Sequence, residues 1–205
     1  MFDYISSFND IAETQIDAIS GNKKCPWLKI EQEIYIDIHY VEQIIVRYYE
    51  NFGVQIKDLV GKCFKNIHFV SLFLLESGVK NTITIGNVKV NGVAKFGCDK
   101  STILGDIDRG YERGIADAHA WITLPNGVII DLSILPSSEG NSFKKKHMKP
   151  AKCIFCSSKK YDKVYEHIPL YLGDEYIYRV VLQPDDKSVA FAQISAQKIR
   201  NLLNK

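Results

Sequence analysis

The pattern of apolar residues changes its period once along this 205-residue chain, and that change limits the folds it can adopt. Up to about residue 78, apolar side chains recur every three or four residues, which is the period of an amphipathic helix. From Thr82 onward they alternate with polar ones, as in a strand with one buried face. Helices followed by strands predict an α+β fold with N-terminal helices.

The first part of the chain predicts two helices before the central one. Residues 2–19 carry the helical period, and Gly21 suits the end of that helix. A second helix is expected over 35–49, ending before Gly53. The alternation of Ile34, Ile36 and Ile38 leaves a short strand as the alternative at its start.

The central helix is the most distinctive. Its apolar residues follow one another at steps of four, three and four, and Gly78 lies just beyond its end; they are Cys63, Ile67, Val70 and Leu74. Cys63 is therefore expected in the first turn, on the buried side. A helix N-terminus favours the thiolate, and its backbone N–H groups can face a developing oxyanion. This position suits a nucleophile, and a small apolar core residue is the alternative interpretation.

After the central helix, the sequence predicts strands, a long loop and a C-terminal helix. Strands are expected over 82–90 and 120–133, and the glycine-rich stretch 92–117 between them is typical of a long mobile loop. A final strand over 176–182 and a C-terminal helix over 190–203 complete the prediction.

His119 and Asp131 flank a predicted hairpin whose turn is Pro125-Asn126-Gly127. A turn centred there makes the two residues cross-strand or diagonal neighbours on one sheet face. The carboxylate can then fix the histidine tautomer and stabilise the imidazolium. His68, five residues after Cys63, lies about 140° around the helix axis from it and is not expected to reach the thiol.

Gly61-Lys62-Cys63 opening a helix, followed by His119-Ala120-Trp121 and then Asp131, resembles the transglutaminase-like branch of the papain-like-fold cysteine superfamily. The resemblance covers 61–133, about a third of the chain. It implies a helix packed on an antiparallel sheet or barrel, with Cys63 as nucleophile, His119 as general base and Asp131 as the orienting group. It implies no metal or other cofactor.

Around this core the chain is expected to form a single domain, 1–205. The segment 1–60 would be its helical N-terminal part, and 134–205 would hold a basic loop, a strand and the C-terminal helix. Two residues are candidates for the second oxyanion donor. Gln55, upstream of the cysteine, is the papain-like candidate, and Trp27 is the transglutaminase-like one.

The implied function is thiol-dependent acyl transfer from an amide, either a peptide or a glutamine-type carboxamide, through a thioester. Water would resolve the thioester in a hydrolase or deamidase, and an amine would resolve it in a transferase. A protein or peptide is the expected substrate. The stretch 97–114 precedes the base and is a candidate flap over the site.

The alternative function is a non-catalytic module that binds protein or nucleic acid through the basic segment 143–163, with zinc as a candidate stabilising metal. Four potential zinc ligands lie within 21 residues: His147, Cys153, Cys156 and His167. The strand-like pattern around the two cysteines places their thiols on opposite faces, which argues against a shared metal.

A lysine-rich segment, 143–163, has eight lysines against one acid and thus a charge of +7, which leaves −5 for the rest of the chain. It is a candidate docking surface for an acidic protein partner. It contains no arginine, so specific nucleic-acid binding is not expected.

The cysteines, the apolar stretches and the N-terminal residues indicate the cellular compartment in which the protein is expected. Five cysteines, an odd and scattered number, favour reduced thiols over a disulfide framework. No apolar stretch approaches the ~20 residues of a membrane-spanning helix. Near Met1 the chain carries acidic residues where a signal peptide would have a basic start and an apolar run. The protein is therefore expected to begin at Met1 and to stay in the cytoplasm unless a dedicated secretion system exports it.

Overall fold

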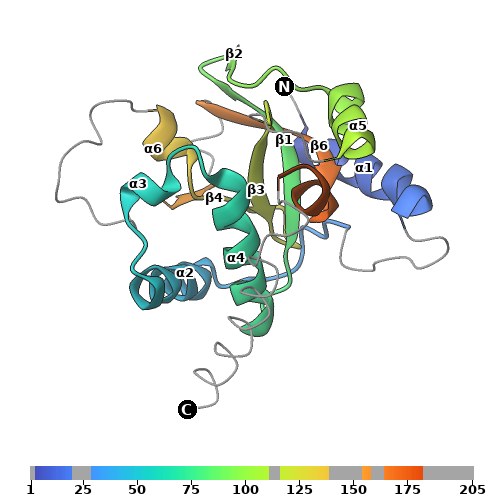
Figure 1. Ribbon diagram of the computed structural model, residues 1–205. Coiled ribbons are helices and arrows are strands. Elements are labelled where there is room, and N and C mark those ends of the chain that lie inside the picture. Colours follow the sequence, from blue (N-terminus) through green and yellow to red (C-terminus); the bar gives the residue numbers. More distant parts are fainter. Residues whose placement is uncertain (1–2, 20–28, 111–115, 139–153, 158–163, 182–205) are drawn as a thin grey trace.

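The computed structural model has an α+β fold in which helices pack against an antiparallel sheet (Figure 1). The coarse fold class predicted from the sequence is therefore confirmed. The structure describes residues 3–19, 29–110, 116–138, 154–157 and 164–181.

The helices are α1 (Tyr4–Ile19), α2 (Ile38–Phe52), α3 (Ile56–Leu59), α4 (Cys63–Glu76), α5 (Lys100–Arg109), α6 (Ile134–Ser138) and the π-helix η3 (Ile177–Val181). The strands are β1 (Thr82–Val90), β2 (Val93–Ala94), β3 (His119–Thr123), β4 (Ile129–Asp131), β5 (Phe155–Cys156) and β6 (Tyr165–Leu172). Their order across the sheet is β2-β1-β3-β4-β5, with β6 paired to β1. Every pairing is antiparallel.

Helix α2 begins and ends where its local sequence dictates. The Asp37 side chain accepts a hydrogen bond from the Tyr40 backbone N–H at its start, and Gly53 takes the left-handed conformation at its end. The alternative of a strand at Ile34, Ile36 and Ile38 is wrong, because Ile38 is the first residue of the helix.

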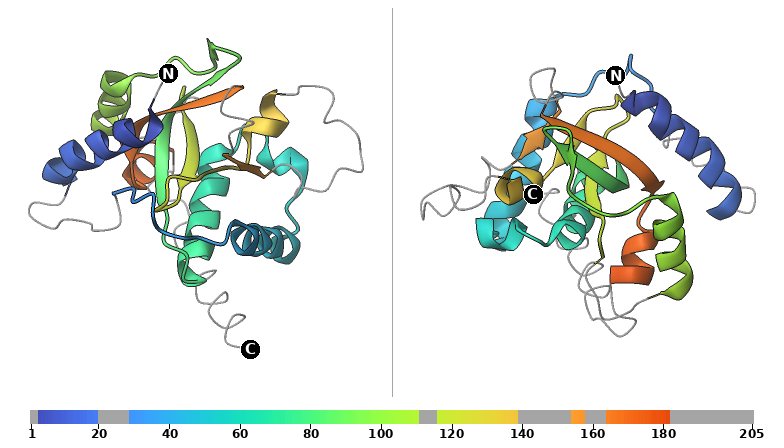
Figure 2. Two further views of the ribbon diagram at one scale, coloured as in Figure 1. Left: turned by 180° about the vertical axis from the view of Figure 1, so that it is seen from behind. Right: turned by 90° about the horizontal axis from the view of Figure 1, so that it is seen from above.

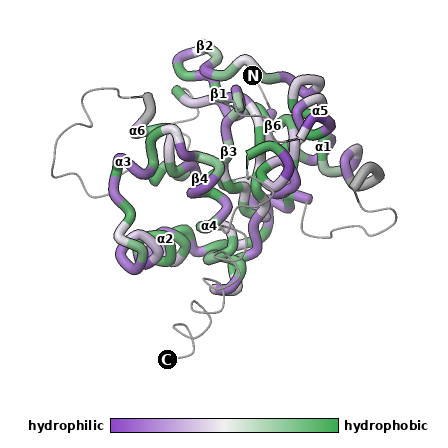
Figure 3. The backbone as a smooth tube through the Cα atoms, in the orientation of Figure 1, coloured by the Kyte–Doolittle hydropathy of each residue, from purple (hydrophilic) through white to green (hydrophobic). Residues whose placement is uncertain are grey.

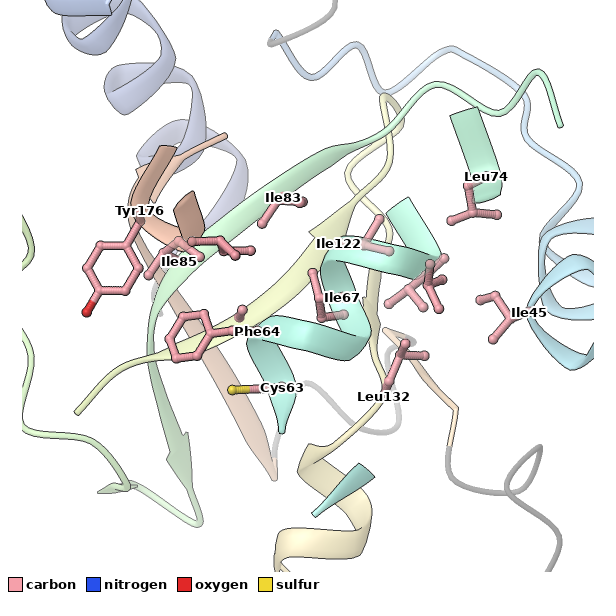
Figure 4. Close-up of a cluster of buried hydrophobic side chains, with 14 of the residues drawn as sticks. Ile45, Cys63, Phe64, Ile67, Leu74, Ile83, Ile85, Ile122, Leu132 and Tyr176 are labelled. Carbon is pink, nitrogen blue, oxygen red and sulfur yellow. The ribbon is translucent and has the colours of Figure 1, made fainter. Parts of the chain in front are cut away.

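Helix α4 confirms the predicted central helix and covers one face of the sheet. Its predicted stripe is buried, and it packs against Ile83 and Ile85 of β1 and Ile122 of β3 (Figure 4). Helix α2 adds Ile45 to the same apolar cluster from the other side of α4. Figure 3 shows hydrophobic residues gathered where α4 meets the sheet.

Helix α1 lies along β6, on the side of the sheet away from α2 and α4 (Figure 2). Phe8 and Ala12 pack with Leu172 of β6. The Gln15 side chain accepts from the Leu172 backbone N–H at 2.8 Å and donates to its carbonyl, so the helix also continues the hydrogen bonding of the strand. This helix was predicted from its period alone, and its existence is confirmed.

The described part of the predicted final strand, residues 176–181, does not form a strand. Residues 177–181 form η3, and the strand at this end of the chain is β6. Strand β6 contains Pro169, which pairs with Gly86 of β1 next to a register shift at Ile85/Gly86. A bulge accommodates a proline within a strand because it interrupts the ladder of hydrogen bonds.

The stretch 92–117 was predicted as a long mobile loop, and this is wrong for its middle third, which forms α5. Asp99 caps that helix by accepting from the Thr102 backbone N–H at 2.8 Å. Ile103 and Ile107, four residues apart, bury its apolar side. The glycine-rich pattern obscured this short helix, because glycines lie both inside it and on either side of it.

Several predictions concern residues outside the described ranges. These are Gly21, Trp27, the helix at 190–203, the zinc candidates His147 and Cys153, and nearly all of the lysine-rich segment. Within the described ranges, no helix is both long and apolar enough to cross a bilayer. The division of the chain around 61–133 stays a prediction.

Gly86 offers a test of the β1–β6 packing. A Cβ at this position would lie 2.0 Å from the Ile168 carbonyl oxygen and 2.9 Å from the Trp121 ring. We expect Gly86→Ala to lower the free energy of unfolding by more than about 2 kcal/mol, measured by urea denaturation. Gly105→Ala is the matched control: it lies within α5 with no atom near its Cβ position, and we expect it to be neutral or stabilising. Equal effects of the two changes would contradict this packing.

Candidate active site

The β3–β4 hairpin brings His119 and Asp131 together as the sequence predicted. Its turn is closed by Gly127, whose N–H donates to the Leu124 carbonyl. The pairs Ile122–Ile130 and Thr123–Ile129 set a register in which Asp131 lies diagonal to His119. Nε2 of His119 is 2.6 Å from Oδ2 of Asp131, and both side chains are buried.

Backbone hydrogen bonds fix the Asp131 carboxylate from its other side. Its Oδ1 accepts from the N–H groups of Ser133 and Ile134, each at 2.9 Å. Asp131 is the last residue of β4, and α6 begins three residues later, so the strand end and the helix start both orient the carboxylate.

Cys63 opens α4 immediately after a sharp turn. Gly61 lies in the turn with φ +67°, a conformation that glycine adopts without strain. The Cys63 thiol lies beside the His119 ring, close enough that the two groups interact electrostatically. Since Nε2 of that ring faces Asp131, Nδ1 is the nitrogen left for the thiol. The structure thus brings all three predicted site residues into one chain of contacts.

The electrostatics of the pair favour two opposite charges. Burial disfavours the imidazolium of His119, but the Asp131 charge, the hydrogen bond to Asp131 and the Cys63 thiol outweigh it and raise the His119 pKa. Burial likewise works against the carboxylate, and the charges and N–H groups of His119 and His167 lower the Asp131 pKa well below its ordinary range. At neutral pH the pair is imidazolium and carboxylate.

His167 is a site residue that sequence reasoning missed. It was considered only as a zinc ligand, but its Nε2 lies 3.0 Å from the Asp131 oxygen that also binds His119. It projects from β6, opposite Val88 of β1. Without an expected strand there, no spacing signal linked it to Asp131.

Phe96 is a second neighbour that the sequence did not single out. Its ring stacks on His119 with centroids 5.0 Å apart and planes 14° apart. The Asn87 side chain holds the Phe96 backbone at both its N–H and its carbonyl, and Asp117 accepts from the Gly97 N–H at 2.9 Å. These contacts tie the segment before α5 against the imidazole and cover one face of the ring.

Neither of the two candidates for the second oxyanion donor is placed at Cys63 by the described structure. Trp27 lies outside the described residues. Gln55 is exposed at the start of α3, and its backbone N–H donates to Asp58. No hydrogen bond joins its side chain to Cys63 in the described structure. The residue before Cys63, Lys62, provides no side-chain cap for α4, so the first-turn N–H groups beside the thiol have no side-chain acceptor there.

The other histidine and cysteine candidates lie elsewhere. His68 is buried, its Nε2 is 3.3 Å from the Tyr178 hydroxyl, and burial lowers its pKa. Cys156 donates to Glu42 rather than to a metal-ligand set. Within the described residues, no cluster of three or more histidine, cysteine or acidic side chains has a geometry that could hold a metal.

Comparison of the chain with protein-family models, with curated proteins and with solved structures finds no match in any of the three. The case for a function therefore rests on the geometry of the site.

The charges of His119 and Asp131 predict a pH-dependent stability. The lowered Asp131 pKa contributes stability above its ordinary value of 3.8, and this is lost as the pH falls. The raised His119 pKa contributes stability below its ordinary value of 6.5, and this is lost as the pH rises. We expect Asp131→Asn to cost most between these two pH values, about 3 kcal/mol in urea denaturation, and less on either side.

Asp99→Asn is the matched control for this measurement. It makes the same chemical change at an exposed helix cap, where asparagine caps as well as aspartate. A cost of Asp131→Asn that does not vary with pH would show that the pair is not charged.

Proposed function

We propose that this protein is a thiol-dependent acyl-transfer enzyme of the transglutaminase-like branch of the papain-like-fold cysteine superfamily. Cys63 is its nucleophile, His119 its general acid and base, and Asp131 its orienting group. The observation that carries the proposal is the buried chain of contacts from a helix-start thiol through one imidazole to one anchored carboxylate.

In this proposal the attacking group is the Cys63 thiolate, with the His119 imidazolium beside it. Asp131 favours the imidazolium, and the imidazolium in turn favours the thiolate. The start of α4 adds the positive end of the helix dipole beside the sulfur.

Acylation begins when the thiolate sulfur attacks the carbonyl carbon of an amide. The carbonyl π electrons move to oxygen, and the first-turn N–H groups of α4 are placed to stabilise that oxyanion. The tetrahedral intermediate collapses, the C–N bond breaks, and the imidazolium gives its proton to the leaving amine. The products are a thioester on Cys63 and a neutral His119.

Deacylation reverses the roles of the same groups. Neutral His119 takes a proton from water or from an acceptor amine as that nucleophile attacks the thioester carbon. The C–S bond then breaks and the thiolate–imidazolium pair is restored. Water yields a carboxylic acid and an amine yields a new amide. Phe96 covers one face of the imidazole that carries out both proton transfers.

Selective alkylation tests the nucleophile. Burial is the main cause that raises the pKa of Cys98 to about 11 and that of Cys156 to about 12. We expect iodoacetamide at about pH 6 to label Cys63 at least about tenfold faster than either, as read from the labelled peptides by mass spectrometry. His119→Ala should slow labelling of Cys63 and leave Cys98 unchanged. Equal labelling of the three thiols would refute an activated Cys63.

An activated ester tests the thioester step. p-Nitrophenyl acetate should give a burst of nitrophenol and an acetyl group attached to Cys63, found by peptide mass spectrometry. Cys63→Ala should abolish both. Asp131→Asn should slow the burst by about a hundredfold or more, because the imidazole loses its orienting group. A burst that survives Cys63→Ala would place the reactive group elsewhere.

A further inference from the structure

The Asp131 carboxylate binds two imidazoles rather than one. We propose that His167 is a positioning residue for the catalytic pair. It donates to the Asp131 oxygen that also holds His119, so that one carboxylate orients both imidazoles and shares its charge between them. This role rests on the proposed function of Cys63 and His119. It adds a fourth member to the site, from a strand that the other three do not use.

Hydrogen-bond accounting sets the direction of each contact. An ionised carboxylate only accepts, so both His119 and His167 must carry a proton on Nε2. Oδ2 takes these two bonds at 2.6 Å and 3.0 Å, and Oδ1 takes the two backbone bonds. Four donors fill the four acceptor positions of the carboxylate, which is completely buried.

The structure holds the His167 ring in place from several sides. Trp121 meets it edge-on at 5.0 Å, and Phe155 stacks on it at 5.4 Å. Val88 is its cross-strand partner on β1. An aromatic enclosure of this kind fixes the ring plane, so the N–H points at Asp131 with little freedom to turn away.

Sharing one oxygen has a chemical consequence for His119. A carboxylate that accepts fewer hydrogen bonds concentrates its charge on the remaining partner and holds that partner's proton more tightly. The imidazolium of His119 must release its proton to the leaving amine and then take another from water or an amine. By taking part of the Oδ2 charge, His167 keeps the proton affinity of His119 within a range that permits both steps.

Among the described residues, strands β3, β4 and β6 bring ionisable groups close to His167. Asp131 faces it from β4 and His119 reaches the same oxygen from β3. Tyr165 of β6 itself lies against Phe155. The proposal concerns the first two, since they share the carboxylate with His167.

The test is an NMR titration of ¹⁵N-labelled histidine side chains, which reports the pH midpoint at which His119 loses its proton. It is made in Cys63→Ala protein, so that neither the thiol nor catalysis contributes. We expect His167→Phe, which keeps a ring between Trp121 and Phe155 but lacks the N–H, to raise the His119 midpoint by about one pH unit. His167→Gln, whose amide N–H replaces Nε2, should return the midpoint close to that of the parent protein.

His68→Phe is the matched control because it makes the same change at another buried histidine, whose Nε2 faces the Tyr178 hydroxyl rather than Asp131. It should leave the His119 midpoint unchanged. If His167→Phe fails to fold, His167→Met removes the same donor with a flexible apolar side chain, and the same rise is expected. An unchanged midpoint in the folded donor-less variant would show that His167 only packs, and a lowered midpoint would show that it supports His119 rather than sharing Asp131.

This experiment separates two failures. If Cys63 of the otherwise unaltered protein is not preferentially alkylated, the proposed function fails, whatever the titration shows. If Cys63 is alkylated and the His119 midpoint does not rise in the donor-less variant, the proposed function stands and the role of His167 fails.

Discussion

The buried Asp131 carboxylate is the constraint on which the site depends. A charge with no exposure to solvent is stable only when its partners replace the water that it has lost. Two backbone N–H groups and two imidazoles do this, and they come from the start of α6, from β3 and from β6. Satisfying one carboxylate thereby fixes the relative positions of three parts of the fold.

The thiol reaches this cluster because α4 packs on the same sheet. The apolar stripe of α4 fixes how the helix lies across β1 and β3, and its first residue is then beside the first residue of β3, His119. Core packing and site geometry are consequently one arrangement. A change in the core beneath α4 would move Cys63 relative to His119 even without touching either residue.

Sequence predicted the parts of this structure whose signals are local. The period of α4 placed Cys63 in the first turn, and the Pro125-Asn126-Gly127 turn set the register that joins His119 to Asp131. What it missed depends on long-range pairing. Strand β6 contains a proline, which is tolerated because a bulge lies beside it in the pairing with β1. Since this strand was not predicted, the position of His167 was not predicted either. Helix α5 was hidden by the glycines within and around it, although Asp99 marked its start.

The central claim is that a neutral-pH imidazolium at His119 links an activated thiol to Asp131. The most direct measurement is the protonation state of the two ring nitrogens of His119, read from ¹⁵N NMR of the otherwise unaltered protein at about pH 7. The account predicts that both nitrogens carry a proton, and that one of them loses it in Asp131→Asn at the same pH. A neutral His119 ring in the unaltered protein would contradict it.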